Sequence, residues 1–389
     1  MMAHHIDQLT IHSLRRFRGL YLPQLGNVNL LVGQNNSGKT TVLEAVAMFC
    51  RPLDPLEWLA VARRRTIKSS RESLLDGVRW LFPQDTAELD DPYYQGQILI
   101  RGRGAFPCLE AAAQFNGFGA DETGTGSLGY EVEEESSSAG YEDDESEGSS
   151  GYVARGADIT LSALVPPERR VELNASPHEG QLVYEFQLLE DERFIRHEPP
   201  RDPMLAVATV SPFSHRVEQL QVSQLSEATL TAKEFSVLEC VNLIDPEVRE
   251  LEILSRRGIR PTLWVRHATA GYAPLYTLGD GVRRILTMAL ALIEAQNGVL
   301  LIDEIETAIH KDALVRVFQW LVRAASQFNV QLFATTHSLE ALDAVLMAQM
   351  GEPDQLVAFH LPEHGTGQAK RFSGELLDNL RFERGLDIR

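Results

Sequence analysis

The sequence predicts an α/β fold in which a mixed, mainly parallel sheet is covered by helices. Three short apolar runs, 28–32, 299–302 and 331–334, have the length and composition of buried strands. The first two are followed by segments with apolar residues at helical spacing, 40–49 and 314–325. Strands that are apolar on both faces and alternate with helices are typical of a parallel sheet covered on both sides.

The remaining elements follow from the same periodicities. Further strands are predicted at 97–101, 181–189 and 262–266, and a long apolar helix at 283–295. The pattern over 53–83 is helical but irregular. Helical spacing also runs through 220–254, with a helix start at Asp245-Pro246.

Charge is spread unevenly along the 389 residues. The chain has 36 Lys and Arg against 55 Asp and Glu, a net charge of −19. The window 117–151 alone holds eleven acidic residues, eight glycines and seven serines. Such a composition cannot bury enough apolar surface to offset its ordering entropy, which predicts a mobile insertion, most simply a solvated linker. The acidic balance argues against indiscriminate binding of nucleic acid, and local basic faces remain compatible with it.

Composition also bears on location. The longest apolar run, 285–293, is about half of the ~20 residues that a membrane-spanning helix needs. The N-terminus lacks the features of a secretory signal. Cys50, Cys108 and Cys240 are widely separated and have no metal-ligand spacing. We therefore expect a cytoplasmic protein without membrane contact.

A glycine-rich loop directly after the 28–32 strand carries the strongest chemical signal. It reads Gly33-Gln34-Asn35-Asn36-Ser37-Gly38-Lys39-Thr40 and fits G-x-x-x-x-G-K-[ST], which binds phosphate where it joins a strand to a helix. Backbone N–H groups of such a loop surround the phosphates, Lys39 reaches the terminal phosphates, and Thr40 offers its hydroxyl to Mg²⁺. The predicted nucleotide site comprises Gly33, Asn35, Asn36, Ser37, Gly38, Lys39, Thr40 and Thr41.

Two carboxylates stand at the end of the 299–302 strand, the edge at which parallel α/β sheets gather their ligands. Alone, an acidic strand end is equally well explained by a structural role. In a chain with a phosphate loop, Asp303 is predicted to hold Mg²⁺ opposite Thr40, and Glu304 to act as general base on an attacking water.

The 331–334 strand is followed by hydroxyl groups and a histidine. A lone histidine is usually structural, but His337 lies at a third strand end. We predict that His337, beside Ser338, reaches a γ-phosphate or the attacking water. The predicted catalytic residues are thus Lys39, Glu304 and His337.

A further turn, Leu278-Gly279-Asp280-Gly281, opens the 283–295 helix and by itself is best explained as a helix cap. Taken in order, the phosphate loop, this turn, Asp303-Glu304 and Thr336-His337-Ser338 resemble the ATPase heads of the ABC superclass. The resemblance is greatest to the RecF/SMC-like branch that includes the OLD (overcoming lysogenization defect) ATPases. It covers most of the chain outside 53–203.

This resemblance implies an ABC-type P-loop ATPase head with a helical lobe, which uses ATP and Mg²⁺. Two heads would sandwich two ATP molecules, and Gly279, Asp280 and Gly281 of one subunit would reach the nucleotide of the partner. Residues 1–389 would form one ATPase domain. Its parts would be an N-terminal lobe (1–204) with the insertion 117–151, a helical lobe (205–277), and a portion with the signature turn, the Asp-Glu strand and the switch histidine (278–389).

For some functional positions of the resembled family, this sequence offers no residue or more than one candidate. The turn lacks the serine of the transporter signature, which leaves a γ-phosphate contact unassigned. His310 would either contact the opposite subunit or pack internally. The family's glutamine loop has two candidates, Gln114 and Gln219. Arg16 or Phe17 would lie near the bound nucleotide and serve its adenine.

The resemblance also sets the functional hypotheses. OLD nucleases carry a TOPRIM nuclease domain after the ATPase, but 51 residues follow Ser338 here. We therefore expect a stand-alone ATPase subunit that forms a homodimer or higher oligomer and controls a separate effector, for example a TOPRIM-type nuclease, in bacterial antiphage defence or DNA maintenance. The alternatives are a non-hydrolytic scaffold switched by ATP, a RecF-like DNA-repair clamp and a phosphotransferase.

Two basic clusters would allow DNA as a partner. The first is Arg15-Arg16-Phe17-Arg18. The second contains Arg63, Arg64 and Arg65 with Lys68 and Arg71, of which Arg64, Lys68 and Arg71 share one face of a predicted helix. The second cluster is more simply explained as a solvated face or a protein-binding surface.

Overall fold

The computed structural model describes most of the chain. The described residues are 4–64, 73–84, 91–119, 155–170, 173, 180–190, 201–231, 237–255, 260–348, 355–362 and 368–387. The acidic window 117–151 lies outside them beyond residue 119, as do Arg65, Lys68 and Arg71 of the second basic cluster.

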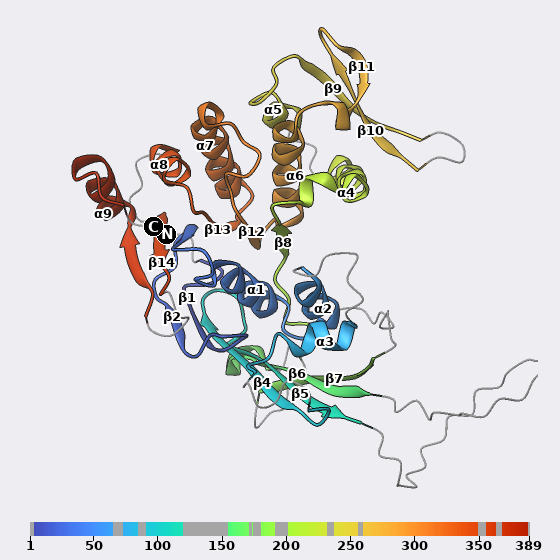
Figure 1. The fold of residues 1–389 in the computed structure, drawn as a ribbon, viewed down its shortest axis with the longest axis vertical. Coiled ribbons are helices and arrows are strands. Elements are labelled where there is room, and N and C mark those ends of the chain that lie inside the picture. The colour runs from blue at the N-terminus through green and yellow to red at the C-terminus, as the bar shows by residue number, and fades with distance from the viewer. Residues whose placement is uncertain are drawn as a thin grey trace, which may run out of the picture.

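A six-stranded sheet forms the centre of the fold (Figure 1). Its order is β15 (Lys370–Ser373), β14 (Leu356–His360), β3 (Val28–Val32), β13 (Gln331–Thr335), β12 (Val299–Ile302) and β8 (Val207–Val210). All neighbours pair in parallel except β15, which is antiparallel to β14. The mainly parallel sheet predicted from the apolar runs is confirmed.

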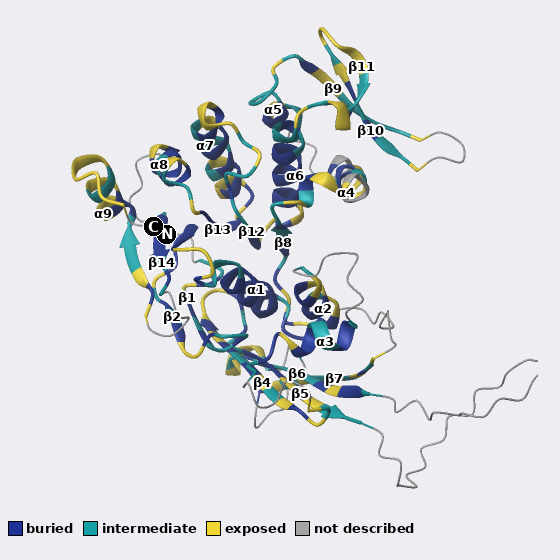
Figure 2. Ribbon diagram, viewed as in Figure 1, coloured by how far each residue is buried: buried dark blue, intermediate teal, exposed yellow. Residues whose placement is uncertain are grey.

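Both faces of this sheet are covered. Successive residues of β12 alternate between two hydrophobic clusters, with Leu301 facing one and Leu300 the other. The first cluster includes α1 (Lys39–Cys50), and the second includes α6 (Asp280–Glu294), α7 (Lys311–Gln327) and α8 (Leu339–Ala348). The central strands and α6 are accordingly buried along most of their length (Figure 2).

A second, antiparallel sheet lies on the other side of α1, which contacts β12 and β13 as well as β4 and β5. Its order is β2 (Leu20–Leu22), β1 (Gln8–Ser13), β4 (Gln95–Arg103), β5 (Glu110–Phe118), β6 (Gly156–Leu164) and β7 (Gln181–Leu189). The sequence prediction missed β5 and β6, which flank the acidic window. Two short helices, α2 (Pro55–Arg63) and α3 (Leu74–Arg79), form the irregular helical segment.

Helices make up only part of segment 205–277, which was expected as a helical lobe. Helices α4 (Glu218–Thr231) and α5 (Val237–Val241) pack against α6, whereas β8 belongs to the central sheet. The helix predicted from Asp245-Pro246 is wrong, because the following residues form β9.

Strand β9 (Val248–Leu254) joins β10 (Thr262–His267) and β11 (Gly271–Pro274) in a small antiparallel sheet that projects beyond α5 and α6 (Figure 1). The C-terminal α9 (Gly374–Asp378) and the helical turn Asn379–Glu383 follow β15. Among the described helices, none combines the length and apolarity needed to span a bilayer.

Candidate functional site

The strand order brings three distant segments of the chain together. Strands β3, β13 and β12 are parallel neighbours, so their carboxyl ends meet at one edge of the sheet. A cavity of about 410 Å³ lies there. It is lined by Arg15, Arg16, Asn35, Asn36, Gly38, Lys39, Thr40, Thr41, Asp303, Glu304, Thr335 and His337.

The phosphate loop joins β3 to α1 and adopts a conformation that requires glycine. Gly38 has φ +93°, and a Cβ on it would lie 2.5 Å from Cζ of Phe17. Asn36 also has a positive φ, 64°, a conformation that asparagine tolerates better than most residues. Gly33 and Ser37 do not line the cavity; instead the Ser37 side chain is buried beside Gly33.

Lys39 is folded back onto its own loop. Its Nζ donates to the carbonyl oxygens of Gly33 at 2.7 Å and Gln34 at 2.9 Å. Burial lowers the pKa of Lys39, and the nearby carboxylates of Asp303, Glu304 and Glu306 oppose that shift. A partly desolvated ammonium beside the N-terminus of α1 is well suited to binding a polyanion.

Asp303 lines the cavity between two threonine hydroxyl groups. Its carboxylate accepts hydrogen bonds from the Thr40 hydroxyl at 3.0 and 3.2 Å and from the Thr335 hydroxyl at 2.6 Å. Thr335 was not predicted as a site residue. The hydroxyl of Thr40 and the carboxylate of Asp303 form the hard oxygen donor set that Mg²⁺ prefers when phosphates and water complete its coordination. These two residues could therefore hold Mg²⁺.

Glu304 is held in an uncommon backbone conformation. Its φ is 49°, and its backbone N–H donates to the Thr335 hydroxyl at 2.8 Å. One carboxylate oxygen accepts from the Thr307 hydroxyl at 3.0 Å. The Glu304 side chain thus lines the cavity. Thr307 fixes one carboxylate oxygen, and the other oxygen can accept a proton from water.

His337 reaches the same cavity and is paired with a carboxylate that the sequence did not single out. Its backbone N–H donates to Oε1 of Glu306 at 3.2 Å, and its Nδ1 lies 3.4 Å from that oxygen. Ser338, in contrast, caps α8, because its hydroxyl accepts from the N–H of Ala341. His310 begins α7 with its side chain 74% exposed, so an internal packing role for it is wrong.

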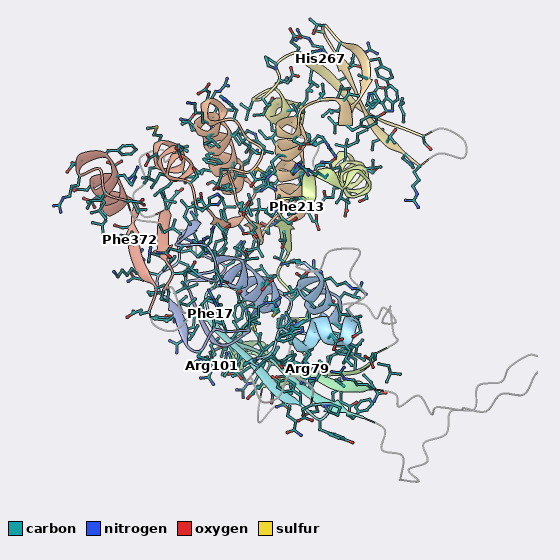
Figure 3. All side chains as sticks on the ribbon, viewed as in Figure 1. Phe17, Arg79, Arg101, Phe213, His267 and Phe372 are labelled. Atoms are coloured by element: carbon teal, nitrogen blue, oxygen red, sulfur yellow. The ribbon has the colours of Figure 1, made fainter. Side chains whose placement is uncertain are left out.

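The arginines after β1 separate into different roles. Arg16 lines the cavity, whereas Phe17 is fully buried beneath Gly38 in the N-terminal half of the fold (Figure 3). Of these two candidates for the adenine, only Arg16 is therefore accessible to a nucleotide. Arg15 forms an ion pair at 2.8 Å with Glu44, whose side chain is fully buried in α1.

The turn Gly279-Asp280-Gly281 does not line this cavity. Gly279 caps α6, and the Asp280 carboxylate, 40% exposed, pairs with Arg216 at 3.1 Å and Arg283 at 3.4 Å. A Cβ on Gly281 would lie 3.0 Å from the carbonyl oxygen of Ala308, in the loop after Glu304. The turn is therefore presented at the surface, away from its own phosphate loop.

The two glutamine candidates lie in different elements of the fold. Gln114 lies in β5 of the outer sheet and pairs with Gln97. Gln219 lies in α4. The strand beside β12 is β8, and the N–H of Asp303 donates to the carbonyl oxygen of Val210 at its end. Ser211 therefore occupies the position next to the carboxylates. The sequence did not indicate β8, and the two glutamines stay predictions.

The second basic cluster is only partly described. The helix α2 ends at Arg63, and Arg64 forms an ion pair at 2.8 Å with Glu57. The predicted helical face shared by Arg64, Lys68 and Arg71 lies outside the described residues.

Arg284 is a residue that sequence reasoning missed. It is fully buried in the first turns of α6, and its guanidinium donates to the carbonyl oxygens of Ser211, Asp303 and Glu304. Burial lowers its pKa to about 10, so it stays charged at neutral pH. The Arg284 guanidinium thus connects α6 to the backbone of Asp303 and Glu304.

Replacing Arg284 with methionine is expected to lower the free energy of unfolding by about 2–4 kcal/mol, because several buried carbonyl groups lose a charged donor. Urea denaturation measures this. The control is Arg323→Met in α7, where the exposed guanidinium donates, among the described residues, only to the carbonyl oxygen of Gln319 of its own helix, and the expected change is below about 0.5 kcal/mol. Equal losses in the two variants would contradict the assigned contacts of Arg284.

Comparison with known proteins identifies the family. The family model described as "AAA domain, putative AbiEii toxin, Type IV TA system" matches residues 28–105 and 168–343, nearly two thirds of the chain. The chain belongs to this AAA-domain family. The match includes the phosphate loop, both carboxylates and His337. With the RecF similarity described next, it confirms an ATPase head of the ABC superclass, in the RecF/SMC-like branch.

Two curated relatives match parts of this AAA-domain protein. An uncharacterized protein of Methanocaldococcus jannaschii is 33% identical over 115 residues, which are 29% of this chain and 99% of that protein. The DNA replication and repair protein RecF of Xanthomonas oryzae pv. oryzae is 50% identical over 45 residues, only 12% of either chain.

Two solved structures overlap loosely with the chain. An SMC head bound to the C-winged helix domain of ScpA overlaps with a TM-score of 0.43 at 12% identity, covering 95% of this chain and 98% of that one. The SMC head domain from Thermotoga maritima overlaps with a TM-score of 0.37 at 13% identity, covering 94% and 98%. The strand order and the family match, rather than these loose overlaps, identify the fold.

Proposed function

We propose that this protein binds and hydrolyses ATP, dimerises through ATP held between two heads, and controls a separate effector. The observation that carries the proposal is the single cavity at the carboxyl ends of β3, β12 and β13, in which a phosphate loop, two carboxylates and a histidine meet. Each group matches one requirement of phosphoryl transfer to water.

The phosphate loop binds the substrate. Its backbone N–H groups at the N-terminus of α1 donate hydrogen bonds to the phosphate oxygens, and Lys39 Nζ donates to phosphate oxygens in place of the loop carbonyls. Thr40 and Asp303 hold Mg²⁺, which neutralises charge on the phosphates when bound. Thr335 keeps the Asp303 carboxylate oriented through its hydrogen bond of 2.6 Å.

Glu304 acts on the attacking water. Its carboxylate lines the cavity, and the bond from Thr307 fixes its direction. It accepts a proton as the water oxygen attacks the γ-phosphorus, and the bond from that phosphorus to the bridging oxygen of the β-phosphate breaks, which releases ADP and phosphate. His337 lines the same cavity and donates a hydrogen bond to the γ-phosphate or the attacking water. Glu306 holds His337 in place. The water-activating pair favours hydrolysis over transfer to another acceptor.

Dimerisation would complete the site. The turn Gly279-Asp280-Gly281 is exposed and lies outside its own cavity, so it is free to approach the nucleotide of a second head. Closure of two such heads around ATP gives the change of shape by which an effector, such as a TOPRIM-type nuclease, would be controlled. The segment shared with a DNA replication and repair protein supports the proposed role in DNA maintenance.

Phosphate release from ATP by the purified chain tests the hydrolytic part of this proposal. We expect hydrolysis with Mg²⁺, and its loss when EDTA removes the metal, because the carboxylates of Asp303 and Glu304 would then face the negative phosphates with no metal to neutralise the charge. Heat-denatured protein is the control. ATP-induced dimers without any Mg²⁺-dependent hydrolysis would instead support the non-hydrolytic scaffold.

A further inference from the structure

A second cavity adjoins the candidate nucleotide site. Its volume is about 610 Å³. It is lined by Arg15, Arg16, Arg18, Trp80, Phe82 and Gln84. Arg15 and Arg16 also line the phosphate-loop cavity, so these two arginines form the boundary between the two spaces.

Trp80 stands on a rigid support with its ring in solvent. It ends α3, and its N–H donates to the carbonyl oxygen of Asp76. The next two residues, Leu81 and Phe82, are buried, and the ring of Phe82 packs against Phe115 at 5.3 Å. The Trp80 side chain is nevertheless 50% exposed. A large aromatic ring exposed on a well-packed backbone offers a flat stacking surface.

The arginine segment is tied to this tryptophan. The N–H of Arg15 donates to the carbonyl oxygen of Leu81 at 2.7 Å, and its guanidinium donates to that of Trp80 at 3.2 Å. Phosphate-loop residues and Trp80 are thus held in a common frame, because Phe17 packs beneath Gly38. The backbone of Trp80 is therefore fixed relative to the phosphate loop.

The boundary keeps positive charge available for a ligand. Arg15 is neutralised by Glu44, but neither Arg16 nor Arg18 forms an ion pair with a described carboxylate. Nη2 of Arg16 is buried and has no hydrogen-bond acceptor among the described residues. The Gln84 side chain donates from Nε2 to the carbonyls of Arg79 and Phe82, which leaves its Oε1 as an acceptor.

We propose that this second cavity binds the base and ribose of the nucleotide whose phosphates lie in the phosphate loop, with Trp80 as the stacking surface for the base. A nucleoside triphosphate joins a polyanion to an aromatic ring, and the two adjoining cavities match these parts in the same order. Arg16 lies where the two parts join. The inference rests on the proposed ATP binding and adds a residue outside the sequence motifs.

The test compares ATP with inorganic tripolyphosphate, which has no base, by titration calorimetry. Base–aromatic stacking contributes about 1–3 kcal/mol, so Trp80→Ala should raise the Kd for ATP about 5- to 100-fold and leave the Kd for tripolyphosphate unchanged. Trp80→Phe, which keeps a ring, should recover most of the affinity. Trp264→Ala, a matched change in the remote β10, should alter neither value.

Fluorescence supplies a second readout. The chain has four tryptophans, and ATP should quench the wild-type emission but not that of Trp80→Phe. Unchanged ATP affinity in Trp80→Ala, with tripolyphosphate binding that still depends on Lys39, would overturn the base-binding inference and leave the proposed function standing. A wild-type chain that binds neither ligand would overturn both.

Discussion

A Lys39→Ala chain is expected to lose ATP binding and keep its fold. Nζ of Lys39 is the cation nearest the loop carbonyls that phosphate would displace, and burial already strips part of its hydration. Charge-assisted hydrogen bonds contribute about 1.5–3 kcal/mol each, so losing two of them should raise the Kd for ATP at least about 100-fold. Calorimetric titration with ATP measures this directly.

Two further variants serve as comparisons for Lys39→Ala. Lys39→Arg keeps the charge but replaces a compact ammonium with a planar fork, and should recover only part of the affinity. Lys311→Ala removes an exposed lysine at the start of α7 and should not change it. ATP affinity that is the same in Lys39→Ala and the wild type would reject this cavity as the nucleotide site.

A Glu304→Gln chain is expected to bind ATP normally and hydrolyse it about 10²- to 10⁴-fold more slowly. The amide has nearly the same shape as the carboxylate and can still accept from Thr307, but it cannot take a proton from water. Because ATP then persists, closed dimers should accumulate. Phosphate release measures the turnover, and light scattering should show a mass of twice 43.4 kDa when ATP is present.

The matched control for Glu304 is Glu294→Gln at the end of α6, where the exposed carboxylate contacts only Gln224 among the described residues. Its turnover should equal that of the wild type. If wild-type turnover is already as low as that of Glu304→Gln, Glu304 is not a general base, and the scaffold alternative is favoured. If Glu304→Gln hydrolyses less but remains monomeric with ATP, ATP-driven dimerisation is contradicted.

Much of the fold could be predicted where local pattern and tertiary environment agree. Strands β3 and β12 match their predicted ranges because each is apolar on both faces and the chain has no other way to bury such a run. The prediction failed for β9, whose apolar residues lie in a stretch that also fits helical spacing. The strand conformation of β9 depends on its pairing with β10. A pattern of neighbouring residues in the sequence does not show which strands will pair.

In the candidate site, too, local features could be predicted from the sequence and tertiary contacts could not. The loop around Lys39 has a fixed spacing because backbone geometry around a phosphate is local. Neighbouring Arg283 and Arg284 look alike in sequence, yet the first side chain is 14% exposed and the second is fully buried against backbone carbonyls. Such a difference arises from the rotation of α6 against the sheet.

By itself, the sequence determined the chemistry: the phosphate loop, the carboxylates at one strand end and the histidine at another, each specified by a short run of residues. Only the tertiary structure decided which groups meet. The order β3, β13, β12, β8 placed Thr335 on Asp303 and Ser211 beside the carboxylates, and the packing of the segment after β1 against the end of α3 placed Trp80 next to Arg15. The physical reason is that strand order and helix packing are set by burial of apolar surface over the whole chain, whereas phosphate-binding geometry is set within a few residues.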